Sequence, residues 1–113
     1  MPSPDDYLAH ILLETSFLLR QLQGLEKSIF LDDELRQRAM IRSLEVIGEA
    51  TKNLPDEFKR QHPQVPWRRM AGMRDRLIHG YFGIDYDIVW DVLVNQVPTL
   101  HVEIERLLPK LKD

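Results

Sequence analysis

The sequence comprises 113 residues, of which 43% are hydrophobic and 29% are charged, proportions that fit a single globular domain (residues 1–113) with one hydrophobic core. It contains no cysteine, which excludes disulfides, thiolate metal sites and cysteine nucleophiles. The formal net charge of -3 argues against a general nucleic-acid-binding protein, although an average charge can conceal a local basic patch.

The amino-terminal residues do not have the pattern of a targeting signal. Residues 1–6 are acidic and lack the basic stretch that opens a secretory signal peptide. No apolar run in the sequence reaches the length that is needed to span a membrane. We therefore expect a cytoplasmic protein without membrane contact.

The first predicted helix has a clear beginning. Ser3 is its expected N-cap, Pro4 takes the first helical position, and Asp5 and Asp6 lie near the positive helix end. Gly24 marks its expected end. Its apolar stripe is wide and has to be covered on more than one side. The stripe comprises Leu8, Ile11, Leu12, Leu18, Leu19, Leu22 and Leu25.

The second predicted helix begins at the cluster of residues 32–34 and ends near Asn53, because Leu54 and Pro55 follow. Its expected buried face holds Met40, Leu44, Ile47 and Leu54. A second face carries the charged residues Arg38, Arg42, Glu45, Glu49 and Lys52. These charges either form a solvated surface with salt bridges or line a cleft that faces the functional site. The sequence alone favours neither interpretation.

A short extra helix is predicted over residues 56–61, and residues 62–66 then form a rigid connector that contains two prolines. Pro66 opens a third main helix, which ends near His79 because glycines follow.

The last predicted helix starts at Asp85 as N-cap. From Tyr86 to Leu111 its apolar residues fall alternately four and three apart, a spacing that suits near-antiparallel packing. Pro98 lies inside this helix and is expected to kink it. No segment shows strand-like alternation. The sequence therefore predicts an all-α, up-and-down four-helix bundle with a short extra helix.

The candidate functional site is the segment Arg74-Asp75-Arg76-Leu77-Ile78-His79-Gly80-Tyr81. In a continuous helix, Arg74 and Tyr81 would lie about two turns apart and share a face. His79 can join them only if the helix unwinds, which the glycine after it makes easy. Asp75 lies four residues before His79, so its carboxylate can orient the imidazole or raise the pKa of the imidazole.

A basic segment surrounds this site. Residues 59–76 contain six Lys or Arg, among them Arg74 and Arg76, and one acid, Asp75, so their net charge is +5. The rest of the chain carries -8. The basic segment can hold an RNA target, but taken without a motif, such a charged face more often serves solubility.

An arginine and a histidine beside a phosphate can cleave RNA without a metal ion. The histidine takes the proton of the ribose 2'-hydroxyl, or it donates one to the leaving 5'-oxygen. The arginine stabilises the negative charge on the phosphoryl oxygens, and the phenol of Tyr81 can hold the phosphate or orient the histidine. The product is a 2',3'-cyclic phosphate, and DNA resists. One histidine cannot be base and acid simultaneously, so a dimer that joins two motifs would supply both.

The same residue types also have ordinary structural roles. A histidine can cap a helix end, a tyrosine can pack, and an arginine can bind backbone carbonyls. The four histidines lack ligand spacing with supporting carboxylates, so we expect no metal site. Trp67 and Trp90 are predicted to be core or interface anchors, and His62 is predicted to be an exposed loop residue.

The motif and its surroundings resemble a known family. Arg74-x4-His79-x-Tyr81 matches the Arg-x4-6-His-x-Tyr motif of HEPN domains. The segments 66–75, 81–85 and 47–50 resemble the HepT branch of that superfamily, and the resemblance extends over nearly the whole chain. The position after the motif arginine is often Asn or Asp in this family, and Asp75 fits.

The resemblance implies a HEPN-like homodimer whose motifs share a cleft, with the activity of a ribonuclease toxin. Arg74 and His79 would be the catalytic residues, supported by Asp75 and Arg76. The resemblance also implies a toxin–antitoxin system, in which a neighbouring MNT-type nucleotidyltransferase antitoxin transfers AMP to Tyr81. The added phosphates would neutralise the arginine charge in the cleft. The alternative is an inactive helical dimer that binds a nucleotidyltransferase or a nucleotide.

Overall fold

A computed structural model describes residues 2–78 and 83–112, and these residues form seven helices and no strand. In chain order the helices are α1 (Pro4–Leu22), α2 (Lys27–Asp32), α3 (Glu34–Asn53), α4 (Asp56–Gln61), α5 (Trp67–Ile78), α6 (Tyr86–Asn95) and α7 (Val97–Lys112). The predicted all-α class is confirmed.

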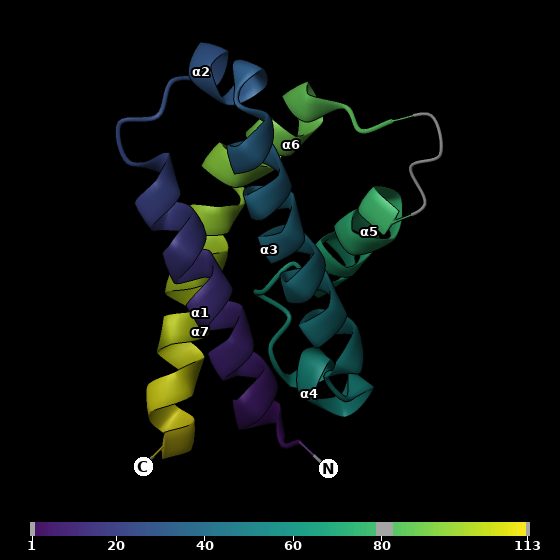
Figure 1. The fold of residues 1–113 in the computed structure, drawn as a ribbon. Coiled ribbons are helices and arrows are strands. Elements are labelled where there is room, and N and C mark those ends of the chain that lie inside the picture. Colours follow the sequence, from purple (N-terminus) through teal and green to yellow (C-terminus); the bar gives the residue numbers. More distant parts are fainter. Residues whose placement is uncertain (1, 79–82, 113) are drawn as a thin grey trace.

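The long helices run alternately up and down (Figure 1). Helix α1 lies between α3 and α7 and contacts both, and α5 packs against α3. Helix α5 leans away from the other three, so the described helices form a row, α5–α3–α1–α7, rather than a regular square bundle. The short helices α2 and α6 contact each other and lie at the top of the molecule as drawn in Figure 1, where α1 ends and α3 begins.

The predicted limits of the first helix are confirmed by its hydrogen bonds. The Ser3 side chain accepts a hydrogen bond from the backbone N–H of Asp6, and the Asp6 carboxylate accepts one from the backbone N–H of Ser3. This reciprocal pair satisfies two donors at the helix start. Gly24 follows the helix with φ of +68°, a left-handed conformation that glycine adopts without steric cost.

Helix α2 was not predicted, because six residues are too short to show a helical period. The helix is anchored by Phe30, which is fully buried and lies 5.3 Å from Trp90 and 6.4 Å from Tyr86 between ring centres. The buried side-chain amide of Gln37 donates to the carbonyls of Phe30 and Leu31, both at 2.9 Å. These contacts fix α2 against α3 and α6.

The last predicted helix is two helices, and the break between α6 and α7 falls at Gln96, two residues before Pro98. One kinked helix was predicted, and the structure has two separate helices instead. Proline has no N–H to donate and clashes with the carbonyl four residues earlier. As the second residue of a new helix, Pro98 loses no hydrogen bond that a helix interior would require.

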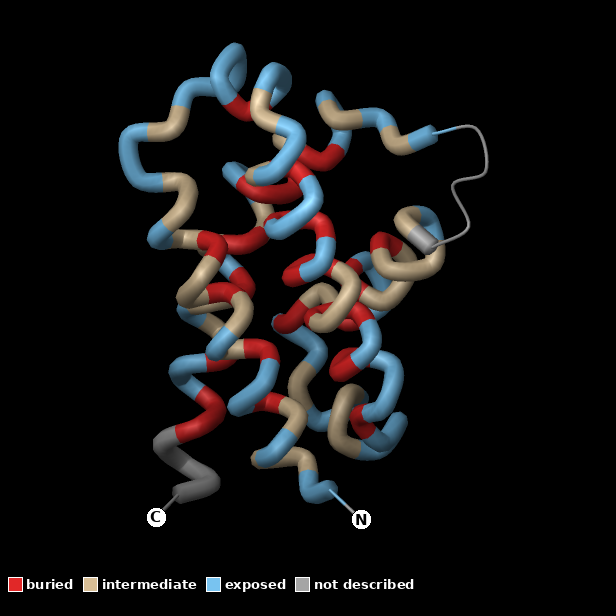
Figure 2. The backbone as a smooth tube through the Cα atoms, in the orientation of Figure 1, coloured by how far each residue is buried: buried red, intermediate tan, exposed pale blue. Residues whose placement is uncertain are grey.

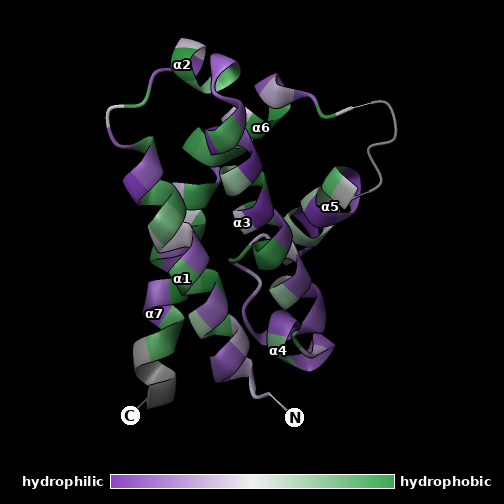
Figure 3. Ribbon diagram, viewed as in Figure 1, coloured by the Kyte–Doolittle hydropathy of each residue, from purple (hydrophilic) through white to green (hydrophobic). Residues whose placement is uncertain are grey.

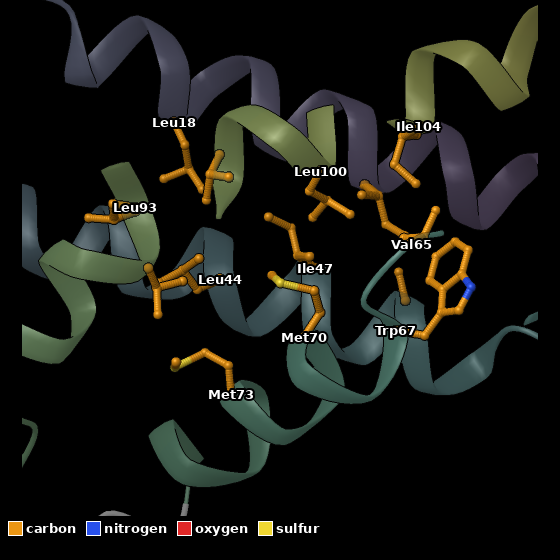
Figure 4. Close-up of a cluster of buried hydrophobic side chains, with 14 of the residues drawn as sticks. Leu18, Leu44, Ile47, Val65, Trp67, Met70, Met73, Leu93, Leu100 and Ile104 are labelled. Carbon is orange, nitrogen blue, oxygen red and sulfur yellow. The ribbon is translucent and has the colours of Figure 1, made fainter. Parts of the chain in front are cut away.

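The hydrophobic core lies between α1, α3, α5, α6 and α7 (Figure 4). The buried face predicted for α3 is confirmed, because Met40, Leu44, Ile47 and Leu54 are at most 2% exposed. Along the long helices buried residues alternate with exposed ones within each turn (Figure 2), as expected for amphipathic helices. None of the described helices has both the length and the hydrophobicity required to cross a bilayer.

The wide apolar stripe of α1 is covered largely by its own chain. Leu8, Ile11 and Leu18 are fully buried, because α1 contacts α3 on one side and α7 on the other. Leu13 remains 65% exposed. The width of the stripe is therefore explained within one protomer and gives no evidence for a dimer.

Candidate functional site

Helix α5 carries the first part of the predicted motif and is anchored by three buried side chains. Trp67, Met70 and Met73 are at most 7% exposed and lie at helical spacing on the side that faces the core. The indole N–H of Trp67 donates to the carbonyl of His62 at 2.9 Å, which ties the connector to the helix start. Trp67 is therefore a core anchor, as predicted.

Gly48 allows α5 to approach α3 closely at the position of Arg74. A Cβ atom added to Gly48 would overlap the Cβ of Arg74, and it would lie 2.9 Å from the Cγ of Arg74 and 3.1 Å from the carbonyl oxygen of Met70. Only the hydrogen atom of a glycine fits between the two helices at position 48. The glycine in the middle of α3 thus sets where the arginine side chain leaves α5.

The guanidinium of Arg74 is held by two carboxylates from different helices. Its Nη2 lies 3.0 Å from Oε2 of Glu49 on α3, and its Nη1 lies 3.1 Å from Oδ1 of Asp75. The side chain is 23% exposed, and its Nε is buried without a hydrogen-bond partner among the described residues. The arginine is therefore oriented by its neighbours and still reaches solvent.

Asp75 links α5 to α3 by a second ion pair. Its Oδ1 accepts a hydrogen bond from Nζ of Lys52 at 2.9 Å as well as the one from Arg74. The bond from Lys52, followed by the one from Arg74, holds the pKa of Asp75 below its ordinary value. Lys52 and Arg74 therefore stabilise the charged form of Asp75 in the folded protein.

The charged face of α3 divides into two parts. Glu49 and Lys52 contact Arg74 and Asp75 across the helix interface, as expected of residues that face the site. Arg38, by contrast, pairs with Glu34 on its own helix and is 75% exposed. Arg42 likewise pairs with Glu45 within α3 and is 74% exposed. Each of the two interpretations therefore holds for part of this face.

The remaining motif residues are placed differently. Arg76 is exposed and borders a surface hollow of about 560 Å³ between the end of α5 and the start of α6. Its floor is apolar and includes Met73, Ile84 and Val89. His79 and Tyr81 lie outside the described residues, as do the predicted helix unwinding after His79 and the approach of Asp75 to His79. Helix α5 is described as far as Ile78, so its predicted end near His79 also lies outside the described residues.

Other histidines lie away from the motif. His62 was predicted to be exposed but is half-buried, because its ring stacks at 4.7 Å on Phe58. His101 joins α7 to α1 through a hydrogen bond of 2.8 Å with the Thr15 hydroxyl. Among the described residues no three His, Asp or Glu side chains are close enough to form a metal site.

Two features of the site were not predicted from the sequence. The role of Gly48 as a close-contact residue had one visible signal, a glycine in the interior of a long helical pattern, where it costs stability relative to alanine. The pairing of Lys52 with Asp75 had no signal, because helical spacing shows which residues share a face but not which helix covers that face.

Comparisons with known proteins identify the family to which the chain belongs. The family described as Ribonuclease HepT-like matches residues 2–107. The protein named "Putative RNase TTE0752" from Caldanaerobacter subterraneus subsp. tengcongensis is 46% identical over 112 residues, which cover 99% of this chain and 100% of that protein. "Probable ribonuclease HepT" from Thermococcus cleftensis is 53% identical over 78 residues, which cover 69% of this chain and 71% of that protein.

No solved structure matches the chain. The family match spans nearly all of the sequence and includes α3 and α5, which carry Gly48 and Arg74. The chain therefore belongs to the HepT-like ribonuclease family of the HEPN superfamily.

Proposed function

We propose that the protein is the toxin of a toxin–antitoxin system and a metal-independent endoribonuclease. The observation that carries the proposal is Arg74, a guanidinium fixed by Glu49 and Asp75 at the surface of the helix that leads to His79. A planar, permanently charged group that is oriented in advance suits the phosphoryl oxygens of RNA. Membership of a ribonuclease family supports the same activity.

The proposed reaction is an internal transesterification. His79 takes the proton of a ribose 2'-hydroxyl, and the 2'-oxygen forms a bond to the adjacent phosphorus. The bond from phosphorus to the 5'-oxygen breaks, and that oxygen receives a proton. Arg74 stabilises the negative charge that develops on the phosphoryl oxygens. The products are a 2',3'-cyclic phosphate and a 5'-hydroxyl, and DNA is not cleaved because it lacks the nucleophile.

We propose that the working unit is a homodimer. The reaction needs a base at the 2'-oxygen and an acid at the 5'-oxygen, and one motif contains one histidine. Two protomers whose motifs share a cleft supply both groups. Light scattering tests this point, because a monomer at the concentrations where RNA is cleaved would contradict it.

We further propose that a neighbouring MNT-type nucleotidyltransferase neutralises the toxin by modifying Tyr81. The phenol oxygen attacks the α-phosphate of ATP, pyrophosphate leaves, and the tyrosine loses its proton. The AMP group then places a phosphate near Arg74, where it competes with RNA for the same guanidinium. Coexpression followed by intact-mass measurement tests this step, because each modification adds one AMP. The added mass should disappear in Tyr81→Phe.

The nuclease activity is tested with purified protein and total RNA. The wild-type protein should cleave, and His79→Ala should lose at least about 100-fold in rate, because general acid–base catalysis contributes about 10²–10⁴. A matched control is His10→Ala, since His10 is an exposed residue of α1. Cleavage that survives His79→Ala would contradict the proposal. Absence of cleavage by the wild-type protein would favour the alternative of an inactive partner-binding dimer.

A further inference from the structure

A basic groove lies between α3, α4 and the start of α5, beside the candidate site. The groove has a volume of about 1200 Å³. Five cationic side chains line it, together with a single acidic residue, Asp56. The cations are Lys52, Lys59, Arg60, Arg68 and Arg69. In Figure 3, α4 is drawn largely in the purple of hydrophilic residues. The groove is therefore a strongly positive surface on a chain whose net charge is negative.

Most of the positive charge in the groove is not strongly neutralised. Arg68 and Arg69 are exposed and form no ion pair with any residue that the structure describes. The Lys59 side chain is only 21% exposed, and its Nζ lies 3.6 Å from Asp56 and donates to the carbonyl of Thr51 at 3.4 Å. Arg60 pairs with Glu57 one helical turn away, and both are 71% exposed. An exposed pair such as Arg60–Glu57 is weak, so a phosphate can compete for Arg60 and can bind Arg68 and Arg69.

The groove is continuous with the candidate site through Lys52. This lysine lines the groove and also donates to Asp75, whose carboxylate binds Arg74. A chain of charged contacts therefore leads from the groove to the proposed catalytic arginine. An anionic polymer bound at Arg74 can reach the groove by passing Asp75, whose carboxylate is already paired with Lys52 and Arg74.

The floor of the groove favours recognition of phosphates over recognition of bases. Trp67 lies at the groove but is 7% exposed, and its N–H is already bonded to the carbonyl of His62. It offers no open face for stacking a base, which is the usual aromatic contact with single strands. Contacts from lysine and arginine to phosphate position a nucleic acid without reading its sequence.

We propose that this groove binds the phosphate backbone of single-stranded RNA next to the cleaved bond, an inference that rests on the proposed ribonuclease function. RNA is favoured over an acidic protein because the groove is linked, through Lys52 and Asp75, to the arginine proposed to bind the scissile phosphate. The residues outside the basic segment 59–76 carry a charge of -8, which repels a polyanion elsewhere and directs it toward the basic segment.

The test measures RNA affinity as a function of salt. The probe is a fluorescent single-stranded RNA of about 12 nucleotides that is 2'-O-methylated throughout and therefore cannot be cleaved. Each phosphate contact contributes about 0.7 to the slope of log affinity against log salt for a single strand. In Arg68→Ala/Arg69→Ala the slope should become less steep by about 1.4, and binding at low salt should weaken.

Controls separate the groove from a general charge effect. Arg38→Ala/Arg106→Ala removes the same charge from exposed arginines that do not line the groove, and it should leave the slope unchanged. Arg68→Lys/Arg69→Lys keeps the charge and should retain the wild-type slope. Lys59→Ala/Arg60→Ala on α4 should reduce the slope as the α5 pair does, which keeps the proposal testable if one variant fails to fold.

The outcomes also separate this proposal from the proposed function. A wild-type slope and affinity in both groove variants would overturn the groove proposal, even if the wild-type protein cleaves RNA. The same holds if the groove variants lose only their affinity for the purified neighbouring nucleotidyltransferase, because the groove would then be a protein-binding surface. Absence of cleavage by the wild-type protein would instead overturn the proposed function, whatever the binding slopes.

Discussion

The α1–α7 interface and the α3–α5 interface differ in the contacts that join their helices. Buried leucine and isoleucine side chains such as Leu18, Leu100 and Ile104 meet where α1 and α7 pack (Figure 4). Among the described residues the polar link between these two helices is the Thr15–His101 hydrogen bond. The α3–α5 interface also buries Met70 and Met73, and it adds a close backbone approach at Gly48 and two ion pairs that cross it.

The difference indicates that one interface mainly stabilises the fold and that the other orients the Arg74 side chain. Burial of large apolar side chains supplies most of the free energy of folding. The ion pairs of the α3–α5 interface are partly exposed, with Glu49 at 53% and Asp75 at 45%, and such pairs contribute little to stability. Their evident effect is to fix the direction of the Arg74 guanidinium. Stability and site geometry therefore depend on different residues and can be changed separately.

The largest effect on stability is expected at the apolar interface. Leu18→Ala removes a fully buried side chain and should lower the free energy of unfolding by about 2–5 kcal/mol. Urea unfolding followed by circular dichroism measures this loss. The fraction that remains folded should cleave RNA at the wild-type rate, because Arg74 and its partners are unchanged. A strong loss of activity per folded molecule would contradict the separation of the two interfaces.

The opposite pattern is expected for Arg74→Ala. The rate of RNA cleavage should fall by about 10²–10³-fold, as it does when one donor to a developing oxyanion is removed. The free energy of unfolding should change by less than about 1 kcal/mol, because the lost ion pairs are partly exposed. Arg74→Lys keeps the positive charge but cannot form bidentate hydrogen bonds, so it should retain only part of the wild-type cleavage rate. Wild-type kinetics in Arg74→Ala would remove this residue from the proposed reaction.

Gly48→Ala should lower both the free energy of unfolding and the rate of RNA cleavage. The new methyl group overlaps the Arg74 side chain, so α5 must shift or the arginine must change rotamer, at a cost of about 1–3 kcal/mol. The cleavage rate should fall with it. Gly72→Ala is the matched control, because a Cβ there meets no atom within 4 Å. This helical substitution should stabilise the protein by up to about 1 kcal/mol. Equal behaviour of the two variants would show that the close approach at Gly48 is unimportant.

The smallest effect is expected for Asp75→Asn. The pKa of Asp75 is lowered by Lys52 and then by Arg74, so the folded state favours the carboxylate. Its contribution to stability is present above its ordinary pKa and is lost as the pH falls through the lowered value. Urea unfolding across the acid range should show the wild-type protein slightly more stable at neutral pH. The two proteins should become equal on acidification. A difference that persists when Asp75 is protonated would assign its role to packing.

Local signals in the sequence predicted local structure well. Ser3 and Gly24 mark the limits of α1 because capping and left-handed turns depend on neighbouring residues alone. Helix α2 was missed because Phe30 is stabilised by rings from α6, which are distant in the sequence. A bend at Pro98 was predicted, but the division into two helices at Gln96 was not.

The same distinction applies to the candidate site. Arg74 and Asp75 were identified from a contiguous motif, and the structure places them together. Their partners Glu49 and Lys52 lie on another helix, and the sequence showed only that these two residues share a face with other charges. Which charges face α5 depends on the approach of two helices at Gly48, a contact between distant residues. His79 and Tyr81 remain predictions from the motif.

The most direct test of the central claim identifies the ends of the cleaved RNA after the protein has been treated with a chelator. The proposed reaction of Arg74 and His79 predicts undiminished cleavage, fragments that end in a 2',3'-cyclic phosphate, and new 5'-hydroxyl ends. Mass spectrometry distinguishes these ends from 3'-hydroxyl and 5'-phosphate ends. Loss of cleavage on chelation, or fragments with 5'-phosphates, would contradict the account.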